Sequence, residues 1–84
     1  MMNGAENMNI LTLKFFDDNF IIYEYQPEGI GQKGVISYDR NTDKFSIEKS
    51  AEGDNGVYAR MAQAKIADII GKKSLPIECV QAWY

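Results

Sequence analysis

The sequence predicts an α+β fold, an antiparallel four-stranded meander followed by one helix packed on one sheet face. Three observations predict it. Short β-branched and aromatic segments alternate with turn residues up to Ser50, the apolar period then changes from two to 3.6, and 84 residues suffice for one domain. We expect a disordered N-terminal segment at residues 1–7, five of which are polar or small, and a single α+β domain at residues 8–84.

The strands are predicted by alternation and by the turns between them. Asp17-Asp18-Asn19 has the short polar side chains of a turn, so the segments on either side form a hairpin. Pro27 and Gly29 end the second strand, and Asp39-Arg40-Asn41-Thr42-Asp43 is a further turn. The expected strands are residues 8–16, 20–26, 34–38 and 44–48.

A helix over roughly residues 55–71 follows from a stripe of residues spaced three and four apart. Asp54 or Asn55 is suited to cap its start, and Gly71 is suited to end it in a left-handed conformation. After Pro76, residues 78–84 are compatible with a short C-terminal β segment. The stripe consists of Tyr58, Met61, Ala62, Lys65, Ile66, Ile69 and Ile70.

Composition restricts the classes of partner. Apolar residues make up 45% and charged residues 25% of the chain, as in globular proteins. A net charge of −3 with scattered basic residues argues against nucleic acid and against anionic membranes as partners. The longest apolar run, Phe20–Tyr23, is too short to span a bilayer. The single cysteine, Cys79, cannot form an internal disulfide, so we expect a cytoplasmic location.

Several motifs together resemble a family of small bacterial proteins of unknown function. They are Tyr23-Glu24-Tyr25-Gln26-Pro27-Glu28-Gly29, the turn from Asp39 to Lys44, Tyr58-Ala59-Arg60 and Ala82-Trp83-Tyr84. The resemblance covers nearly the whole chain from Met8. The resemblance implies a bacterial origin and this fold, and it implies no activity.

A glycine-rich motif, Gly29-Ile30-Gly31-Gln32-Lys33-Gly34, matches the dinucleotide-binding pattern in letters alone. That site requires a helix directly after the third glycine, whereas residues 34–38 here predict a strand. The kinase version requires a separate lysine and metal-binding loops for which the chain has no room. We therefore interpret the motif as a strand connection, with a weak anion contact at its backbone N–H groups as the minor alternative.

Metal and catalytic sites lack their usual residues. Asp39, Asn41 and Asp43 are spaced as in a calcium loop, but Lys44 and Ser50 replace the glycine and the glutamate that the loop requires. The chain contains no histidine, so Cys79 has no evident activating partner. We predict no catalytic residue, no metal ligand and no cofactor, and regard the protein as more consistent with a binding module than with an enzyme.

The aromatic residues suggest an interface. The first two strands are apolar on both faces, whereas one helix covers only one face of a sheet. Two explanations remain open: the segment Trp83-Tyr84 covers the second face, or a second copy or another protein does. The candidate interface residues are Ile10, Phe16, Phe20, Ile22, Trp83 and Tyr84.

Two hypotheses of function follow. The leading one is a non-enzymatic protein-interaction module that self-associates or binds an unidentified protein. The alternative is a small-molecule-binding domain, or a minimal enzyme, that uses the glycine-rich loop at residues 29–34 and tyrosine hydroxyls. An apolar sheet face favours the first hypothesis, and a pocket lined by Tyr23, Tyr25 or Tyr38 favours the second.

Overall fold

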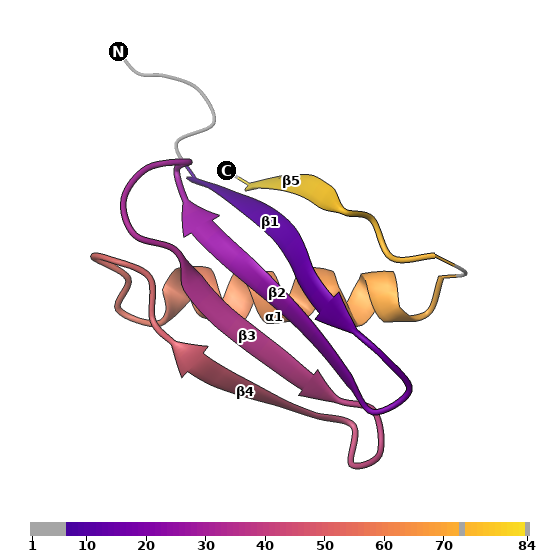
Figure 1. The fold of residues 1–84 in the computed structure, drawn as a ribbon. Coiled ribbons are helices and arrows are strands. Elements are labelled where there is room, and N and C mark those ends of the chain that lie inside the picture. The colour runs from indigo at the N-terminus through magenta and orange to yellow at the C-terminus, as the bar shows by residue number, and fades with distance from the viewer. Residues whose placement is uncertain (1–6, 73, 84) are drawn as a thin grey trace.

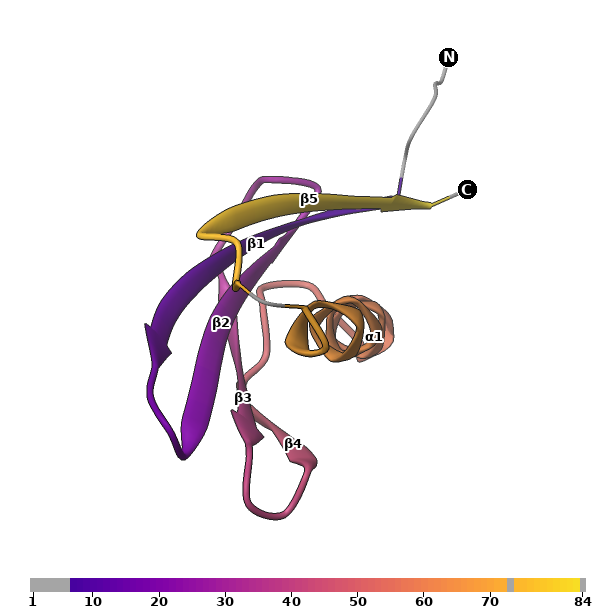
Figure 2. The same ribbon diagram turned by 90° about the vertical axis from the view of Figure 1, so that its right-hand side faces the viewer.

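The computed structural model describes residues 7–72 and 74–83 and contains an antiparallel sheet with one helix against one face (Figures 1 and 2). The expected meander and helix are confirmed, each with bounds within two residues of the expectation. The expected disordered segment lies outside the described residues except for Asn7, which begins the first strand. The elements are β1 (Asn7–Phe16), β2 (Phe20–Pro27), β3 (Gly34–Asp39), β4 (Lys44–Lys49), α1 (Val57–Ile70) and β5 (Glu78–Trp83).

The sheet has the order β4-β3-β2-β1-β5. The chain leaves the sheet after β4 at one edge, runs through α1 across one face and returns as β5 at the opposite edge, antiparallel to β1 (Figure 1). We call the face that points away from α1 the outer face. The C-terminal β segment is thus a fifth strand that extends the sheet, so it does not lie across the outer face. The explanation in which Trp83-Tyr84 covers that face stays open, because the side chain of Trp83 and all of Tyr84 lie outside the described residues.

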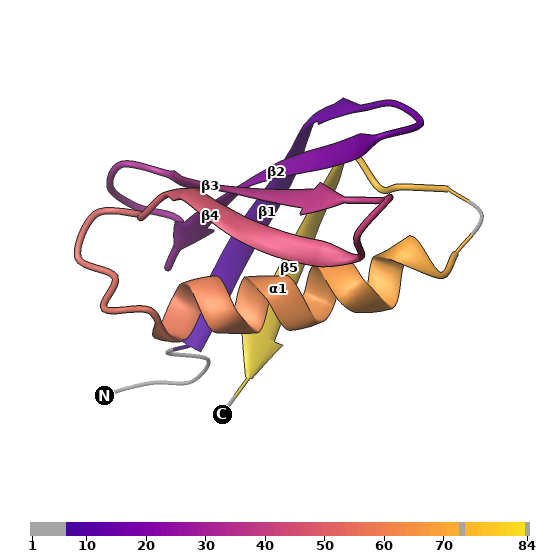
Figure 3. The same cartoon turned by 90° about the horizontal axis from the view of Figure 1, so that it is seen from below.

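The core lies between α1 and the inner face of β1, β2 and β3 (Figures 2 and 3). The helix residues that are buried are Ala59, Ala62, Ile66 and Ile69, whereas Tyr58 and Met61 of the expected stripe are only half-buried. Small alanines bring the helix axis close to the sheet, which leaves room for large side chains on the strands. The large buried side chains of the sheet are Leu11, Ile21, Tyr23, Tyr25 and Ile36.

A register shift in β1 changes which phenylalanine faces the helix. Between Leu13 and Phe15 the pairing with β2 slips by one residue, so that Phe15 opposes Ile22 and Phe16 opposes Ile21. Because directly opposed residues share a face, Phe15 lies on the outer face and Phe16 on the helix face. Strict alternation predicts the opposite placement for both phenylalanines, and that prediction is wrong.

The two ends of α1 differ from each other in chemistry. At the start, the N-cap residue is Gly56, so neither Asp54 nor Asn55 occupies the expected cap position. Asp54 Oδ1, two residues before the cap, nevertheless accepts hydrogen bonds from the backbone N–H groups of Gly56 (2.9 Å) and Tyr58 (3.1 Å). At the other end, Gly71 has a φ of −73°, an ordinary right-handed conformation. The expectation of a left-handed Gly71 is therefore wrong. A tight turn ends the helix instead, with the N–H of Lys72 donating to the carbonyl of Ile69 at 2.9 Å.

Candidate functional site

An apolar patch lies on the outer face at the turn end of the β1–β2 hairpin. It consists of Phe15, Phe20 and Ile22, which we call the outer patch. Phe15 and Ile22 are directly opposed across the two strands, and Phe20 lies two residues from Ile22 on the same face. Phe15 is 47% exposed and Phe20 is 42% exposed. In the described part of the chain, no helix or strand covers the outer face (Figure 2).

The middle of the outer face is polar. The Glu24 carboxylate lies 3.6 Å from the Lys33 ammonium and 4.0 Å from the Lys14 ammonium. The hydroxyl of Ser37 donates to the Glu48 carboxylate at 2.7 Å. These charged and polar groups confine the apolar surface near the hairpin turn to the outer patch.

The six predicted interface residues do not form one surface. Phe20 and Ile22 belong to the outer patch, whereas Phe16 is 58% exposed on the helix face. Ile10 is half-buried on the outer face, where the turn at Gly29 packs against it. The strand residue Trp83 pairs with Asn7, about 30 Å along β1 from the hairpin turn. The side chain of Trp83 and all of Tyr84 lie outside the described residues.

A cavity of about 380 Å³ adjoins the hairpin turn on the helix side. Two cations, Arg40 and Lys72, stand at its rim beside the apolar side chains. The backbone N–H of Arg40 donates to the Asn19 carbonyl at 2.8 Å, which joins the β3–β4 turn to the hairpin turn (Figure 1). The ammonium of Lys72 is also 3.5 Å from the Asp68 carboxylate. The cavity is lined by Phe16, Arg40, Ile70, Lys72, Ser74 and Leu75.

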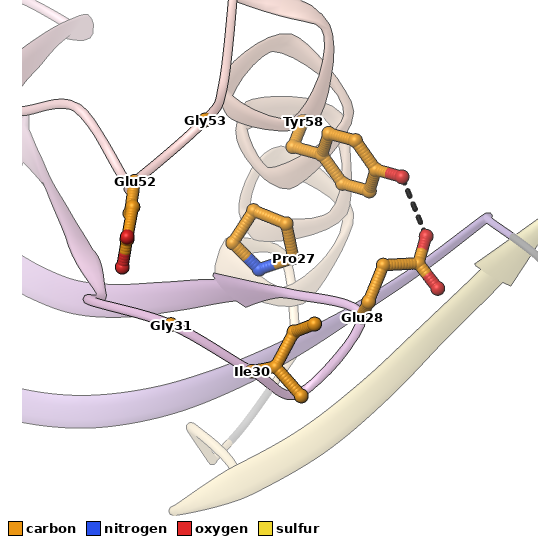
Figure 4. Close-up of a pocket in the computed structure, with 7 residues that line it drawn as sticks. All are labelled: Pro27, Glu28, Ile30, Gly31, Glu52, Gly53 and Tyr58. Carbon is orange, nitrogen blue, oxygen red and sulfur yellow. Dashed lines mark hydrogen bonds between the residues drawn. The ribbon is translucent and has the colours of Figure 1, made fainter.

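The glycine-rich loop forms one wall of a second cavity, also of about 380 Å³, near the start of α1 (Figure 4). Gly31 approaches Glu52 so closely that an added Cβ would lie 3.0 Å from the carboxylate, and its φ of +81° suits glycine. Glu52 accepts a hydrogen bond from the N–H of Gln32 at 3.0 Å. The lining residues are Pro27, Glu28, Ile30, Gly31, Glu52, Gly53 and Tyr58.

The charge of this second cavity opposes anion binding. Its described lining contains the carboxylates of Glu28 and Glu52 and no basic side chain. Glu28 accepts a hydrogen bond from the Tyr58 hydroxyl, which raises the pKa of that phenol. Since two carboxylates repel a phosphate group, the arrangement disfavours the weak anion contact considered for the glycine-rich loop. The loop itself connects β2 to β3, as expected.

Like the hydroxyl of Tyr58, those of Tyr23, Tyr25 and Tyr38 form hydrogen bonds inside the protein. Tyr23 donates to the Pro76 carbonyl at 2.7 Å, and Tyr38 donates to the Asp43 carboxylate. Tyr25 donates to Asp54 Oδ2 at 2.7 Å and accepts from the N–H of Ala51 at 3.0 Å. Tyr23, Tyr25 and Tyr38 do not line either cavity, although a pocket lined by them would have favoured the small-molecule hypothesis.

Neither the predicted turn nor Cys79 is arranged as a catalytic or metal site. Residues 39–43 form a turn in which the N–H of Asp43 donates to the Asp39 carbonyl at 2.8 Å. Among the described residues, no group of three or more His, Cys, Asp or Glu side chains is placed to hold a metal ion. Cys79 is half-buried on the inner face of β5, and burial raises the pKa of its thiol, which disfavours the thiolate nucleophile.

Comparisons with protein-family models, with curated proteins and with solved structures find no significant match to this chain. A membrane-spanning helix is likewise not found in the residues that the structure describes.

Proposed function

We propose that the protein is a non-enzymatic protein-interaction module of a bacterial cytoplasm that self-associates through its sheet. The observation that supports this proposal is the outer patch, three large apolar side chains on a sheet face that no described element covers. Exposed apolar surface in water favours association, because contact with another protein removes that surface from water.

The surroundings of the outer patch also support contact with protein in preference to membrane. The hairpin turn beside it carries the exposed carboxylates of Asp17 and Asp18. Anionic lipid surfaces would repel these charges, whereas a protein partner can place basic groups against them. Arg40, at the neighbouring turn, offers such a group in a second copy of the chain.

The substitution Ile22→Lys tests this function. Ile22 lies on the outer face, so the lysine ammonium can reach water and the fold should be retained. We expect the mass of the associated particle to be halved in sedimentation-velocity experiments at high micromolar concentration. The helical circular dichroism should be unchanged.

The matched control is Gln26→Lys, which adds the same charge to the outer face four residues along β2 from Ile22. It should leave the mass of the particle unchanged. A wild-type protein that stays monomeric at high micromolar concentration contradicts the proposal, and so does an Ile22→Lys variant with undiminished mass.

The second cavity supports one alternative function, the binding of a small molecule. Carboxylates of Glu28 and Glu52 beside the ring of Tyr58 and the apolar Pro27 suit a small organic cation. Calorimetric titration with tetramethylammonium tests this alternative, with ATP as the anionic control. Binding of tetramethylammonium that is lost in Glu28→Gln supports it, and the absence of tetramethylammonium binding contradicts it.

A further inference from the structure

The two edges of the sheet differ in how well they are protected against further strand pairing. Three of the six residues of β4, Lys44, Glu48 and Lys49, are charged, and the pairing of β3 with β4 has a register shift between Val35 and Ile36. Charged side chains and bulges are the usual means of preventing a sheet edge from pairing. β5 has one charged residue in six, Glu78, and a regular register against β1.

The hydrogen bonds of β1 show which backbone groups of β5 point to the open edge. The N–H of Leu13 donates to the carbonyl of Ile77 at 2.8 Å, so the backbone groups of Ile77 point toward β1. Backbone direction alternates along an antiparallel strand. The N–H and C=O groups of Glu78, Val80 and Ala82 therefore point to the open edge. No backbone hydrogen bond to these groups is found among the described residues.

These outward groups are self-complementary about a two-fold axis. If Val80 lies opposite Val80 of a second copy, Glu78 lies opposite Ala82 and all outward groups pair, giving about six backbone hydrogen bonds. If this register is shifted by two residues in either direction, about four backbone hydrogen bonds remain. A shift of one residue places outward groups opposite inward groups.

The side chains favour the same register. Val80 is 59% exposed on the outer face and lies opposite Ile10 in the β1–β5 pair. Pairing at Val80 therefore forms a continuous apolar row, Ile10–Val80 of one copy followed by Val80–Ile10 of the other. The only charged residue of β5, Glu78, faces Ala82, so no like charges are directly opposed.

We propose that β5 pairs antiparallel with β5 of a second copy, with Val80 at the two-fold axis. The product is a continuous ten-stranded sheet with both helices on one side. This contact is separate from the outer patch, which lies toward the hairpin turn. If the two-fold axes of the two contacts intersect at right angles, the product is a tetramer in which two such sheets stack by their outer faces.

Amide hydrogen exchange measured by NMR tests the pairing residue by residue. In the associated wild-type protein, the amides of Glu78, Val80 and Ala82 should exchange at least tenfold more slowly than in the dissociated protein. The amides of Cys79 and Gln81, which point toward β1, should be protected in both states. Equal, fast exchange at Val80 and Ala82 in both states would overturn the proposal.

The substitution Val80→Pro removes an N–H that has no partner among the described residues, so β5 should still pair with β1. It should halve the particle mass, and Val80→Thr, which keeps the N–H, should not. Val80→Lys is the second variant, because it leaves the backbone intact and opposes two ammonium groups across the axis. It should also halve the mass while the circular dichroism stays unchanged.

The variants separate this proposal from the proposed function. With both contacts present, Ile22→Lys and Val80→Pro each give a dimer, and the double variant is monomeric. A wild-type dimer dissociated by Ile22→Lys alone overturns the edge contact and keeps the outer patch. A wild-type dimer dissociated only by the Val80 variants supports the edge contact and contradicts the outer patch. A monomeric wild-type protein overturns both.

Discussion

The two ends of α1 divide the molecule into a polar, hydrogen-bonded end and an apolar, exposed end. At the N-terminal end, Asp54 accepts hydrogen bonds from the Tyr25 hydroxyl and from backbone N–H groups of Gly56, Tyr58 and Ala59. At the C-terminal end, Phe16 is largely exposed and the outer patch lies on the other side of the same hairpin. The first end holds helix to sheet, and the second end carries the surface of the proposed contact.

The groups that stabilise the fold are therefore separate from the residues of the proposed contact. Burial opposes the ionisation of Asp54, but the hydrogen bonds from Tyr25 and from the helix N-terminus outweigh it and lower the pKa of the carboxyl. The carboxylate is thus held in its charged state where the helix dipole also favours it. Changes at Asp54 should affect folding, and changes at the outer patch should affect assembly.

The largest effect on stability is expected for Asp54→Ala. The substitution leaves a buried tyrosine hydroxyl and the first N–H groups of the helix without their acceptor, which should lower the free energy of unfolding by about 3 kcal/mol. Urea denaturation, monitored by circular dichroism, measures this loss in the free energy of unfolding. The control Asp18→Ala, at the exposed hairpin turn, should change stability by less than about 0.5 kcal/mol. Equal losses of stability in Asp54→Ala and Asp18→Ala would contradict the proposal that the N-terminal end of α1 stabilises the fold more than the hairpin turn does.

Alkaline pH should produce the next largest effect. Burial raises the pKa of Tyr23 and of Tyr25 from 10.0 to about 12. A proton bound more tightly in the folded state stabilises the fold fully below the unfolded pKa, and this contribution is lost as pH rises through the folded pKa. Stability should therefore fall between about pH 10 and about pH 12.

Urea denaturation at several pH values measures this fall, and ultraviolet absorbance reports the phenolates. Tyr23→Phe removes one of the two groups and should reduce the slope of stability against pH. An unchanged slope in that variant would contradict the role of Tyr23.

The smallest effect on stability is expected for Phe20→Thr. Phe20 is 42% exposed, and threonine suits a strand, so the free energy of unfolding should change by no more than about 1 kcal/mol. Association should nevertheless weaken at least tenfold, as measured by sedimentation equilibrium. A large loss of stability without a loss of association would show that Phe20 stabilises the fold and does not belong to the proposed contact.

The sequence predicts the elements of the fold well because their signals are local. Alternation, turn residues and a helical period mark four strands and the helix to within two residues. The role of Asp54 at the helix start is also a local signal, a short acidic side chain before an apolar period, although the N-cap itself is Gly56. The hydrogen bond between Tyr25 and Asp54 cannot be predicted from a local pattern, because 29 positions separate the two residues along the chain.

The candidate site was predicted less completely, because it depends on long-range pairing. Nothing in the local pattern at Leu13, Lys14 and Phe15 reveals the register shift that exchanges the faces of the two phenylalanines. The open edge at β5 depends on the pairing of β5 with β1, which no local pattern encodes. The available signal was the single charge in residues 78–83, because a strand with few charges lacks the usual protection against pairing if it lies at an edge.

The pairing of β1 with β5 also has a consequence for the order in which the sheet forms. Thr12 and Glu78 are paired although they are 66 positions apart, whereas successive strands of the meander are joined by short turns. Closing the long loop has an entropic cost that only later contacts offset, so β5 should dock after the meander and α1 have formed. Until then β1 is itself an edge, and a folding chain at high concentration can capture β5 of another molecule there. Dilution during refolding should therefore favour the closed monomeric sheet over strand-exchanged forms.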